Sequence, residues 1–137
     1  MRPIIALAAP LACLVLGGCF ARQVYDGHER PVGQIAILQG SPHARFTGYA
    51  DASAPGEPAF TRLDGGWSGH PIEIHVLPGK YSLRVLCDWG DTSATAIVET
   101  DVEVDMTYPV SCEKVPNTDK ARAVVSAGVQ TPTPRSY

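Results

Sequence analysis

The sequence is poor in charge and has no concentration of positive charge. Only 18% of its 137 residues are charged, and its 11 Lys and Arg are scattered singly among 14 Asp and Glu, which leaves a net charge of -3. A protein that binds nucleic acid needs a basic face to neutralise phosphates, so this composition excludes nucleic acid as a partner. The chain also lacks any repeat of fixed period, and its length fits one small domain.

Residue patterns that carry catalysis or metal binding are missing or incomplete. The four cysteines include no C-x-x-C pair, and His70 and His75, five residues apart in an extended segment, point to opposite faces. Residues 66–70 begin like the G-x-S-x-G turn of serine hydrolases, but His70 takes the place of the last glycine. We therefore predict a protein that is not an enzyme and has no cofactor and no metal. A small hydrolase, or a hydrolase inhibitor, that uses Ser68 and His70 is the alternative.

The longest hydrophobic run of the sequence lies at its start. Arg2 precedes an apolar stretch of 13 residues, Ile4 to Leu16, and Gly17-Gly18 follow. Such a stretch rises about 20 Å as a helix, which is short of the roughly 30 Å hydrocarbon core of a bilayer. A basic start, a short apolar segment and small residues are typical of an export signal. We predict that residues 1–18 form a signal peptide that is removed.

The end of this signal, Leu16-Gly17-Gly18-Cys19, resembles the lipobox of bacterial lipoproteins. The resemblance implies that Cys19 is acylated, becomes the first residue after cleavage and anchors the protein in a membrane. Two or more acyl chains hold a protein firmly, since each buried methylene contributes about 0.8 kcal/mol. Phe20 stands where inner-membrane members of this family commonly carry Asp, which implies the periplasmic face of the outer membrane. The alternative is an ordinary secretory signal, with Cys19 left as a thiol or paired in a disulfide.

The predicted signal and lipidation reduce the number of cysteines that can form a disulfide. Cys13 leaves with the signal and lipid takes Cys19, so Cys87 and Cys112 remain. Paired cysteines in an oxidising compartment form disulfides, and each of these two lies on the Tyr- and Val-bearing face of an alternating segment. We predict a disulfide between Cys87 and Cys112. Closing a loop of about 26 residues stabilises the fold by roughly 3 to 4 kcal/mol in the chain-entropy model.

The mature chain divides into a tether, one domain and a tail. Residues 19–32 are polar with Gly and Pro and predict a flexible tether, whereas residues 33–112 hold short apolar segments separated by turn residues. After Cys112 the pattern stops, which predicts a flexible tail over residues 113–137 with at most a short helix over 121–129. Six to eight short strands and no convincing helix predict an all-β fold, a small antiparallel β-sandwich or an open barrel. The expected strands are 34–39, 43–49, 59–63, 72–76, 81–87, 94–98, 102–104 and 108–112.

Two hairpins are expected within this domain. The alternating segments 72–76 and 81–87 flank a Pro-Gly turn, and the segments 102–104 and 108–112 flank an Asp-Met pair. Alternation on both sides of a tight turn is typical of two paired strands.

The Pro-Gly turn and the residues on either side of it also resemble a known family. V-L-P-G-K-Y-S-L-R-V, from Val76 to Val85, resembles the signature of PEGA-like small β-sandwich modules of bacterial surface proteins. A second group, small proteobacterial lipoproteins, is similar in a Tyr-x-Gly-x-x-x-Pro segment before an Ala-x-Leu strand. The matching residues here are Tyr25, Gly27, Pro31, Ala36 and Leu38. Both resemblances imply a β-sandwich in the cell envelope, and neither brings catalytic residues.

Three aromatic residues mark the candidate binding surface. Trp67 and Trp89 stand beside glycines in expected loops, and Tyr49 ends an expected strand. An exposed indole stacks well on a sugar or a peptide, while the alternative role of both indoles is to cover the ends of the core. The sequence therefore predicts a membrane-anchored lipoprotein of the cell envelope that acts as a binding or scaffolding module. Its expected partner is an envelope protein or a glycan.

Overall fold

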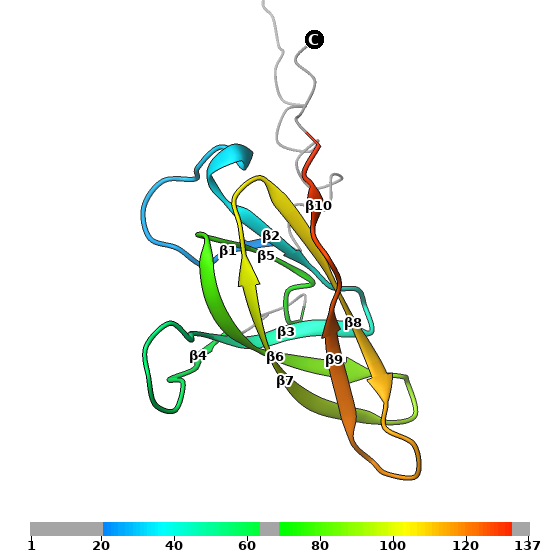
Figure 1. The fold of residues 1–137 in the computed structure, drawn as a ribbon. Coiled ribbons are helices and arrows are strands. Elements are labelled where there is room, and N and C mark those ends of the chain that lie inside the picture. The colour runs from blue at the N-terminus through cyan, green and yellow to red at the C-terminus, as the bar shows by residue number, and fades with distance from the viewer. Residues whose placement is uncertain (1–20, 64–68, 133–137) are drawn as a thin grey trace, which may run out of the picture.

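The computed structural model describes residues 21–63 and 69–132 and is a two-layered β structure (Figure 1). Within these ranges it has ten strands and one short 3-10 turn, and nothing helical there is long or apolar enough to cross a membrane. The elements are β1 (Ala21–Gln23), η2 (Val32–Gln34), β2 (Ala36–Gln39), β3 (Ala44–Asp51), β4 (Thr61–Arg62), β5 (Glu73–Val76), β6 (Gly79–Asp88), β7 (Ser93–Val102), β8 (Met106–Lys114), β9 (Ala121–Val125) and β10 (Val129–Gln130).

The strands form two sheets. One has the order β1-β5-β2-β8-β10, with β9 also paired to β8, and the other has the order β4-β3-β6-β7. This arrangement confirms the predicted all-β sandwich. The larger sheet is mixed and not purely antiparallel, because β1 runs parallel to β5 and β2 runs parallel to β8.

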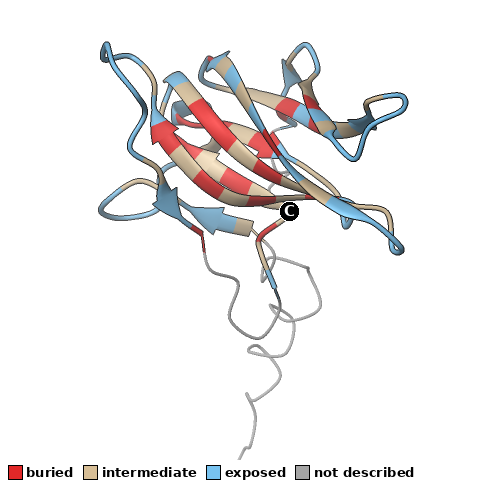
Figure 2. Cartoon of the chain, turned by 90° about the horizontal axis from the view of Figure 1, so that it is seen from below, coloured by how far each residue is buried: buried red, intermediate tan, exposed pale blue. Residues whose placement is uncertain are grey.

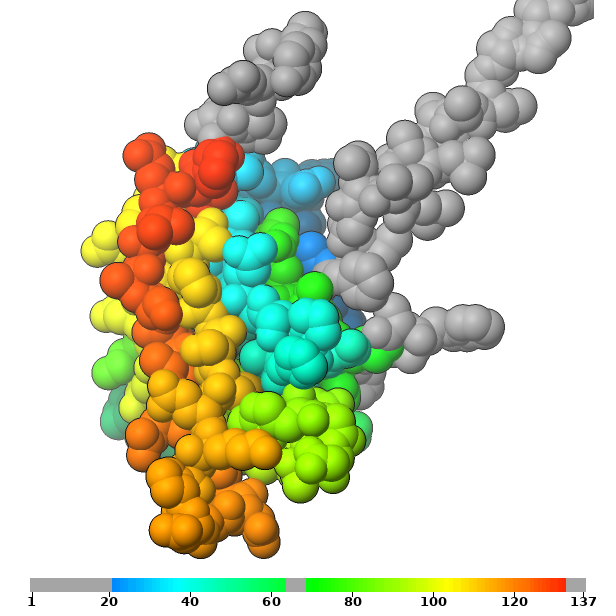
Figure 3. All heavy atoms as spheres, turned by 90° about the vertical axis from the view of Figure 1, so that its right-hand side faces the viewer, coloured from blue at the N-terminus to red at the C-terminus, as the bar shows by residue number. Residues whose placement is uncertain are grey.

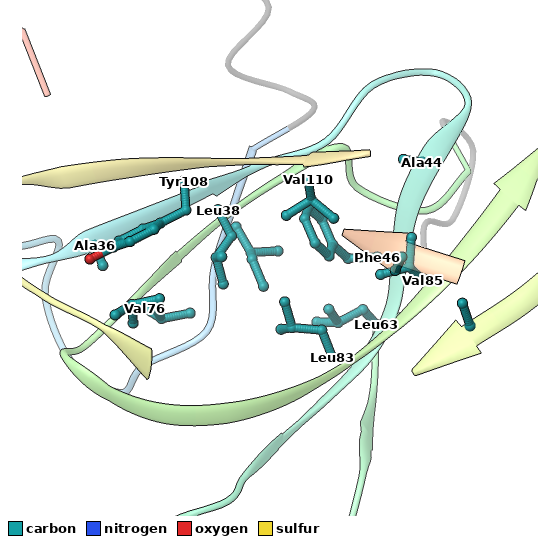
Figure 4. Packing of buried hydrophobic residues seen from close by; sticks show 14 of the residues in the cluster. Ala36, Leu38, Ala44, Phe46, Leu63, Val76, Leu83, Val85, Tyr108 and Val110 are labelled. Carbon is teal, nitrogen blue, oxygen red and sulfur yellow. The ribbon is translucent and has the colours of Figure 1, made fainter. Parts of the chain in front are cut away.

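The core lies between the two sheets and is built from alternate residues of the strands, visible as separate red bands in Figure 2. Phe46, Leu83 and Val85 of the smaller sheet are fully buried against Leu38 and Val76 of the larger one (Figure 4). Successive side chains of a strand point to opposite faces, so one apolar face per strand is enough to build this layer. Each such side chain stabilises the fold by about 1.5 to 3 kcal/mol when fully buried.

The two expected hairpins are both wrong. β5 pairs with β1 and β2, whereas β6 pairs with β3 and β7, so Leu77 and Pro78 carry the chain from one sheet to the other. The segment after Val102 makes the same crossing, since β7 and β8 belong to different sheets. Alternation reports only that one face of a strand is buried. Two strands that face each other across the core therefore show the same pattern as two strands paired in one sheet.

The predicted flexible tail is also wrong over much of its length. β8 extends to Lys114, and β9 and β10 both pair with it in antiparallel fashion, β9 opposite residues 110–114 and β10 opposite residues 106–107. The segment expected as a short helix thus contains β9 and the first residue of β10, and its Ala123 is buried. These strands are short, and backbone pairing with β8 stabilises them more than their own weak hydrophobic pattern.

The predicted tether contains ordered structure as well. β1 pairs with β5, with Ala21 opposite Glu73, and the backbone N–H of Val24 donates a 3.0 Å hydrogen bond to the carbonyl of His75. The 3-10 turn η2 follows before β2. The sandwich therefore extends from residue 21 to residue 131 and not over residues 33–112 alone. A three-residue edge strand leaves no periodic signal in the sequence, since only its pairing fixes it.

Candidate ligand-binding pocket

A disulfide between Cys87 and Cys112 joins the two sheets, as the sequence predicts. Cys87 is fully buried on β6, Cys112 lies on β8, and their Cα atoms are 5.8 Å apart. The bond ties one strand of each sheet together close to the point where both strands end. It therefore fixes the spacing of the sheets at this end of the sandwich.

Trp89 and Lys114 lie two residues beyond these cysteines. The Nζ atom of Lys114 is 5.1 Å from the centre of the Trp89 ring. Residues i and i+2 of an extended chain share a face, so the disulfide places both side chains on facing positions. Trp89 is half-buried and packs against the core, in line with the alternative role of covering its end, whereas Lys114 is exposed. An ammonium over an indole near the surface is attracted by about 0.5 to 1 kcal/mol.

The turn between β6 and β7 holds Trp89 in place. Its backbone N–H donates a 2.9 Å hydrogen bond to the carbonyl of Thr92, and the Asp88 carboxylate accepts a 2.9 Å bond from the N–H of Gly90. Gly90 has a φ of 92°, in the left-handed region that glycine adopts without strain. His43 fixes the start of the turn, because its Nδ1 donates to the Asp88 carbonyl at 2.8 Å.

The turn between β8 and β9 is equally well bonded. The N–H of Val115 donates to the carbonyl of Lys120 at 3.0 Å. The Thr118 hydroxyl donates to the Val115 carbonyl at 2.9 Å and accepts from the N–H of Lys120 at 3.1 Å. Asn117, with a φ of 61°, supplies the left-handed residue of this turn. The β6–β7 turn, which carries Trp89, and the β8–β9 turn, which follows Lys114, are therefore each held by hydrogen bonds within the turn.

A cavity of about 300 Å³ lies between these two turns. Figure 3 shows the orange β8–β9 turn beside the yellow-green β6–β7 turn, which places the two walls next to each other. The cavity has one aromatic wall and otherwise hydroxyl, ammonium and carboxylate groups. We call it the Trp89 pocket, lined by Trp89, Thr92, Ser93, Lys114, Thr118, Asp119 and Lys120. It combines a flat apolar surface with convergent polar groups, as ligand sites commonly do.

A second groove, of about 560 Å³, lies on the outer face of the smaller sheet, under the loop of residues 52–59. Its floor includes Ser82 and Ile97, and its loop wall consists mostly of Ala, Pro and Gly. At its rim, hydrogen bonds from Ser53 lower the pKa of Asp51. The groove has no aromatic wall and no cationic group, so it offers a ligand fewer specific contacts than the Trp89 pocket.

Tyr49 is not part of an exposed binding surface, contrary to the prediction. It packs against the core, and its hydroxyl donates to the carbonyl of Val24 at 3.3 Å. A β-bulge between Phe46 and Gly48 shifts the alternation, so Tyr49 turns inward opposite Leu83. Leu83 precedes Trp89 by six residues along β6, a distance of about 20 Å. The remaining member of the predicted surface, Trp67, lies outside the described residues.

Four lining residues of the Trp89 pocket, Lys114, Thr118, Asp119 and Lys120, were missed because they belong to the predicted tail. Lys114, Thr118 and Lys120 follow Cys112, where the hydrophobic pattern ends. One local signal was present, since Pro116-Asn117 is typical of a turn. A turn after the expected strand 108–112 would have indicated a hairpin and brought these residues back toward the domain.

Of the two residues of the hydrolase alternative, the structure describes only His70. Ser68 lies outside the described residues, and His70 places its Nδ1 2.7 Å from the carbonyl of Leu63. His75 contacts a carboxylate, with its Nε2 2.8 Å from Glu73 Oε2. Within residues 21–63 and 69–132, no group of three or more His, Cys, Asp or Glu side chains is placed to hold a metal ion.

Comparison with protein-family models, with curated proteins and with solved structures finds no match for this chain. The function is therefore argued from the N-terminal motif, the disulfide and the geometry of the Trp89 pocket.

Proposed function

We propose that this protein is an exported, lipid-anchored binding module of the bacterial cell envelope, held at the periplasmic face of the outer membrane and without catalytic activity. The observation that carries the proposal is the Leu16-Gly17-Gly18-Cys19 segment directly after a short apolar run. The Cys87–Cys112 disulfide supports export, because such bonds persist in oxidising compartments.

The place where the chain enters the fold favours this anchoring. Ala21, two residues after Cys19, already pairs on β1, which is an edge strand of the larger sheet. A lipid on Cys19 would therefore hold the sandwich close to the membrane surface. The Trp89 pocket involves the β8–β9 turn, and β9 lies at the opposite edge of that sheet, with β5, β2 and β8 between it and β1. Anchoring through the β1 edge leaves the pocket free for a ligand.

A binding role is supported by the preformed character of the pocket. The main chain of each wall is held by hydrogen bonds, and a disulfide fixes the spacing of the two strands that carry the walls. A site that is ordered before binding loses less conformational entropy when the ligand arrives.

The anchoring half of the proposal is tested by fractionating cells that express the wild type, Cys19→Ser or Cys13→Ser. Cys13 lies inside the signal and serves as the matched control. We expect the wild type and Cys13→Ser in the membrane fraction, extracted by detergent but not by salt, and Cys19→Ser outside it. A wild-type protein that is found outside the membrane fraction would contradict the proposal.

The binding half is tested by in-cell photo-crosslinking. A photoreactive amino acid replaces Ser93 at the pocket, and in a control it replaces Glu57 in the groove on the other face. We expect a reproducible adduct from position 93 and none from position 57. If position 93 yields no adduct, or both positions yield the same one, the pocket is not a binding site in the cell.

A further inference from the structure

We infer that the Trp89 pocket binds a saccharide that carries a carboxylate group. This inference rests on the proposed binding function and names its ligand class. It is drawn from three features of the pocket: the indole of Trp89, the surplus of ammonium groups, and the near absence of other apolar side chains.

Trp89 is half-buried against the core, and the contact that Lys114 makes with the rest of its indole is weak. Lys114 is exposed, and its Nζ lies 5.1 Å from the ring centre. Exposed cation–π contacts of this kind are readily exchanged, since the ammonium is equally well satisfied by an anion. A ligand with one ring and one carboxylate can therefore replace both halves of the contact. Its ring packs on the indole, and its carboxylate takes the ammonium of Lys114.

The ammonium groups give the pocket its preference for an anion. Lys114 and Lys120 both line it, against the one carboxylate of Asp119. The neighbouring charges on β8 and β9 offset each other, because Arg122 lies 3.9 Å from Glu113. Asp88 and Asp91, at the β6–β7 turn, do not line the pocket, so the surplus of positive charge is confined to the lining itself. Lysine binds carboxylates through charge-assisted hydrogen bonds, which are stronger than neutral ones.

The other lining groups favour a saccharide over a peptide. Apart from Trp89, every lining side chain ends in a hydroxyl, an ammonium or a carboxylate. Sugar hydroxyls would meet the hydroxyls of Thr92 and Ser93 and the acceptor oxygens of Asp119, while the less polar ring face would pack on the indole. A volume of about 300 Å³ suits one or two sugar rings and lies at the small end of ligand pockets.

The inference is tested by NMR titration of the full mature lipoprotein, ¹⁵N-labelled, in a zwitterionic detergent that contains no sugar. Four probes are compared at equal ionic strength: cellobiouronic acid, the neutral disaccharide cellobiose, acetate, and tetraglutamate. The readout is the indole N–H signal of Trp89, assigned by its loss in Trp89→Phe. We expect saturable shifts with cellobiouronic acid and at least roughly tenfold weaker binding of cellobiose.

Variants then separate the two parts of the ligand. Lys114→Gln and Lys120→Gln should each weaken cellobiouronic acid binding by about tenfold and leave cellobiose binding unchanged. Trp89→Ala lacks the indole signal and is therefore followed through the backbone amide signals of Thr92 and Ser93, and it should abolish the binding of both disaccharides. Lys80→Gln is the matched control, because Lys80 lies on β6 beside Glu99 and away from the pocket. Dispersed spectra of the lysine variants show that they are folded.

Four outcomes overturn the inference. Equal affinity for cellobiose removes the role of the carboxylate. An equal response to acetate means an anion contact without saccharide recognition, and saturable binding of tetraglutamate at the same residues assigns the pocket to acidic peptides. The absence of any saturable shift also overturns it. If the saccharides fail while the adduct at position 93 persists, only the ligand class is wrong. If both fail, the binding function fails too.

Discussion

Lys114 and Trp89 face each other across a pocket, with Nζ 5.1 Å from the ring centre, and each stands two residues beyond one half of the disulfide. The bond between Cys87 and Cys112 thus joins the sheets and sets the separation of the pocket walls. Stability and site geometry are coupled in this protein through one covalent link.

Removal of the disulfide should lower the stability of the sandwich. For Cys87→Ala/Cys112→Ala we expect the free energy of unfolding to fall by about 2 to 5 kcal/mol, because the unfolded chain regains the entropy that the loop had lost. Guanidinium unfolding measures this, and wild-type protein unfolded in the presence of a reductant should show the same decrease. An unchanged midpoint in both would mean that the bond does not stabilise the sandwich.

Truncation of the core should cost far more than truncation of the exposed face. Phe46 is fully buried between the sheets, whereas Ile97 on the outer face is 60% exposed. We expect Phe46→Ala to destabilise the fold by about 3 to 5 kcal/mol, and Ile97→Ala to change the free energy of unfolding by about 0.5 kcal/mol or less. Thermal or denaturant unfolding of the two variants measures this difference in stability. Similar losses for both variants would contradict the placement of the core.

A buried charge in β9 tests whether the C-terminal segment belongs to the sandwich. Ala123 is 6% exposed on β9, and Ala127 is exposed after β9. We expect Ala123→Asp to cost several kcal/mol, since an unpaired carboxylate would enter an apolar layer, and Ala127→Asp to have little effect. Hydrogen exchange provides a second measure, with slow amides expected over residues 121–125. Fast exchange of these amides, together with unchanged stability of Ala123→Asp, would mean that this segment is a flexible tail.

Alkaline pH should destabilise the protein through Tyr81. Burial, followed by the nearby charges of Asp51 and Tyr49, raises the pKa of Tyr81 above its ordinary value of 10.0. Below that value the hydroxyl is protonated in both states. As the pH rises from there to the raised pKa, the unfolded chain releases a proton that the folded chain keeps, so stability falls.

Tyr81→Phe lacks this group and should lose less stability over the same pH range. The variant also loses the 2.7 Å hydrogen bond from the Tyr81 hydroxyl to the Leu77 carbonyl, which gives a constant offset at lower pH. Urea midpoints from about pH 8 to about pH 11 should therefore converge for the two proteins. Curves that remain parallel would show that the Tyr81 proton does not contribute.

The sequence was informative where one face of a strand is buried. Leu38 and Ile74 alternate with more exposed residues, and both lie in strands within the expected segments. The two cysteines were matched correctly because the predicted signal peptide and lipidation left only one pair. Each of these predictions depends on local periodicity or on simple counting, which need no knowledge of strand partners.

The features that escaped prediction depend on contacts distant in the sequence. The turn at Leu77 was expected to close a hairpin, but strand alternation does not distinguish a partner in the same sheet from one across the core. Tyr49 was expected outside, and one bulged residue reversed its orientation. Lys114 and Lys120 join the pocket only because β9 returns along β8.

The central claim, a lipid-anchored protein of the envelope, is tested most directly by the mass of its N-terminal peptide. Protein extracted from membranes is digested, and the peptide that ends at Arg22 is analysed by mass spectrometry. We predict that it begins at Cys19 and carries a diacylglyceryl group on the thiol, with an additional acyl chain on the amino group. A peptide that begins elsewhere, or an unmodified Cys19, would contradict the account.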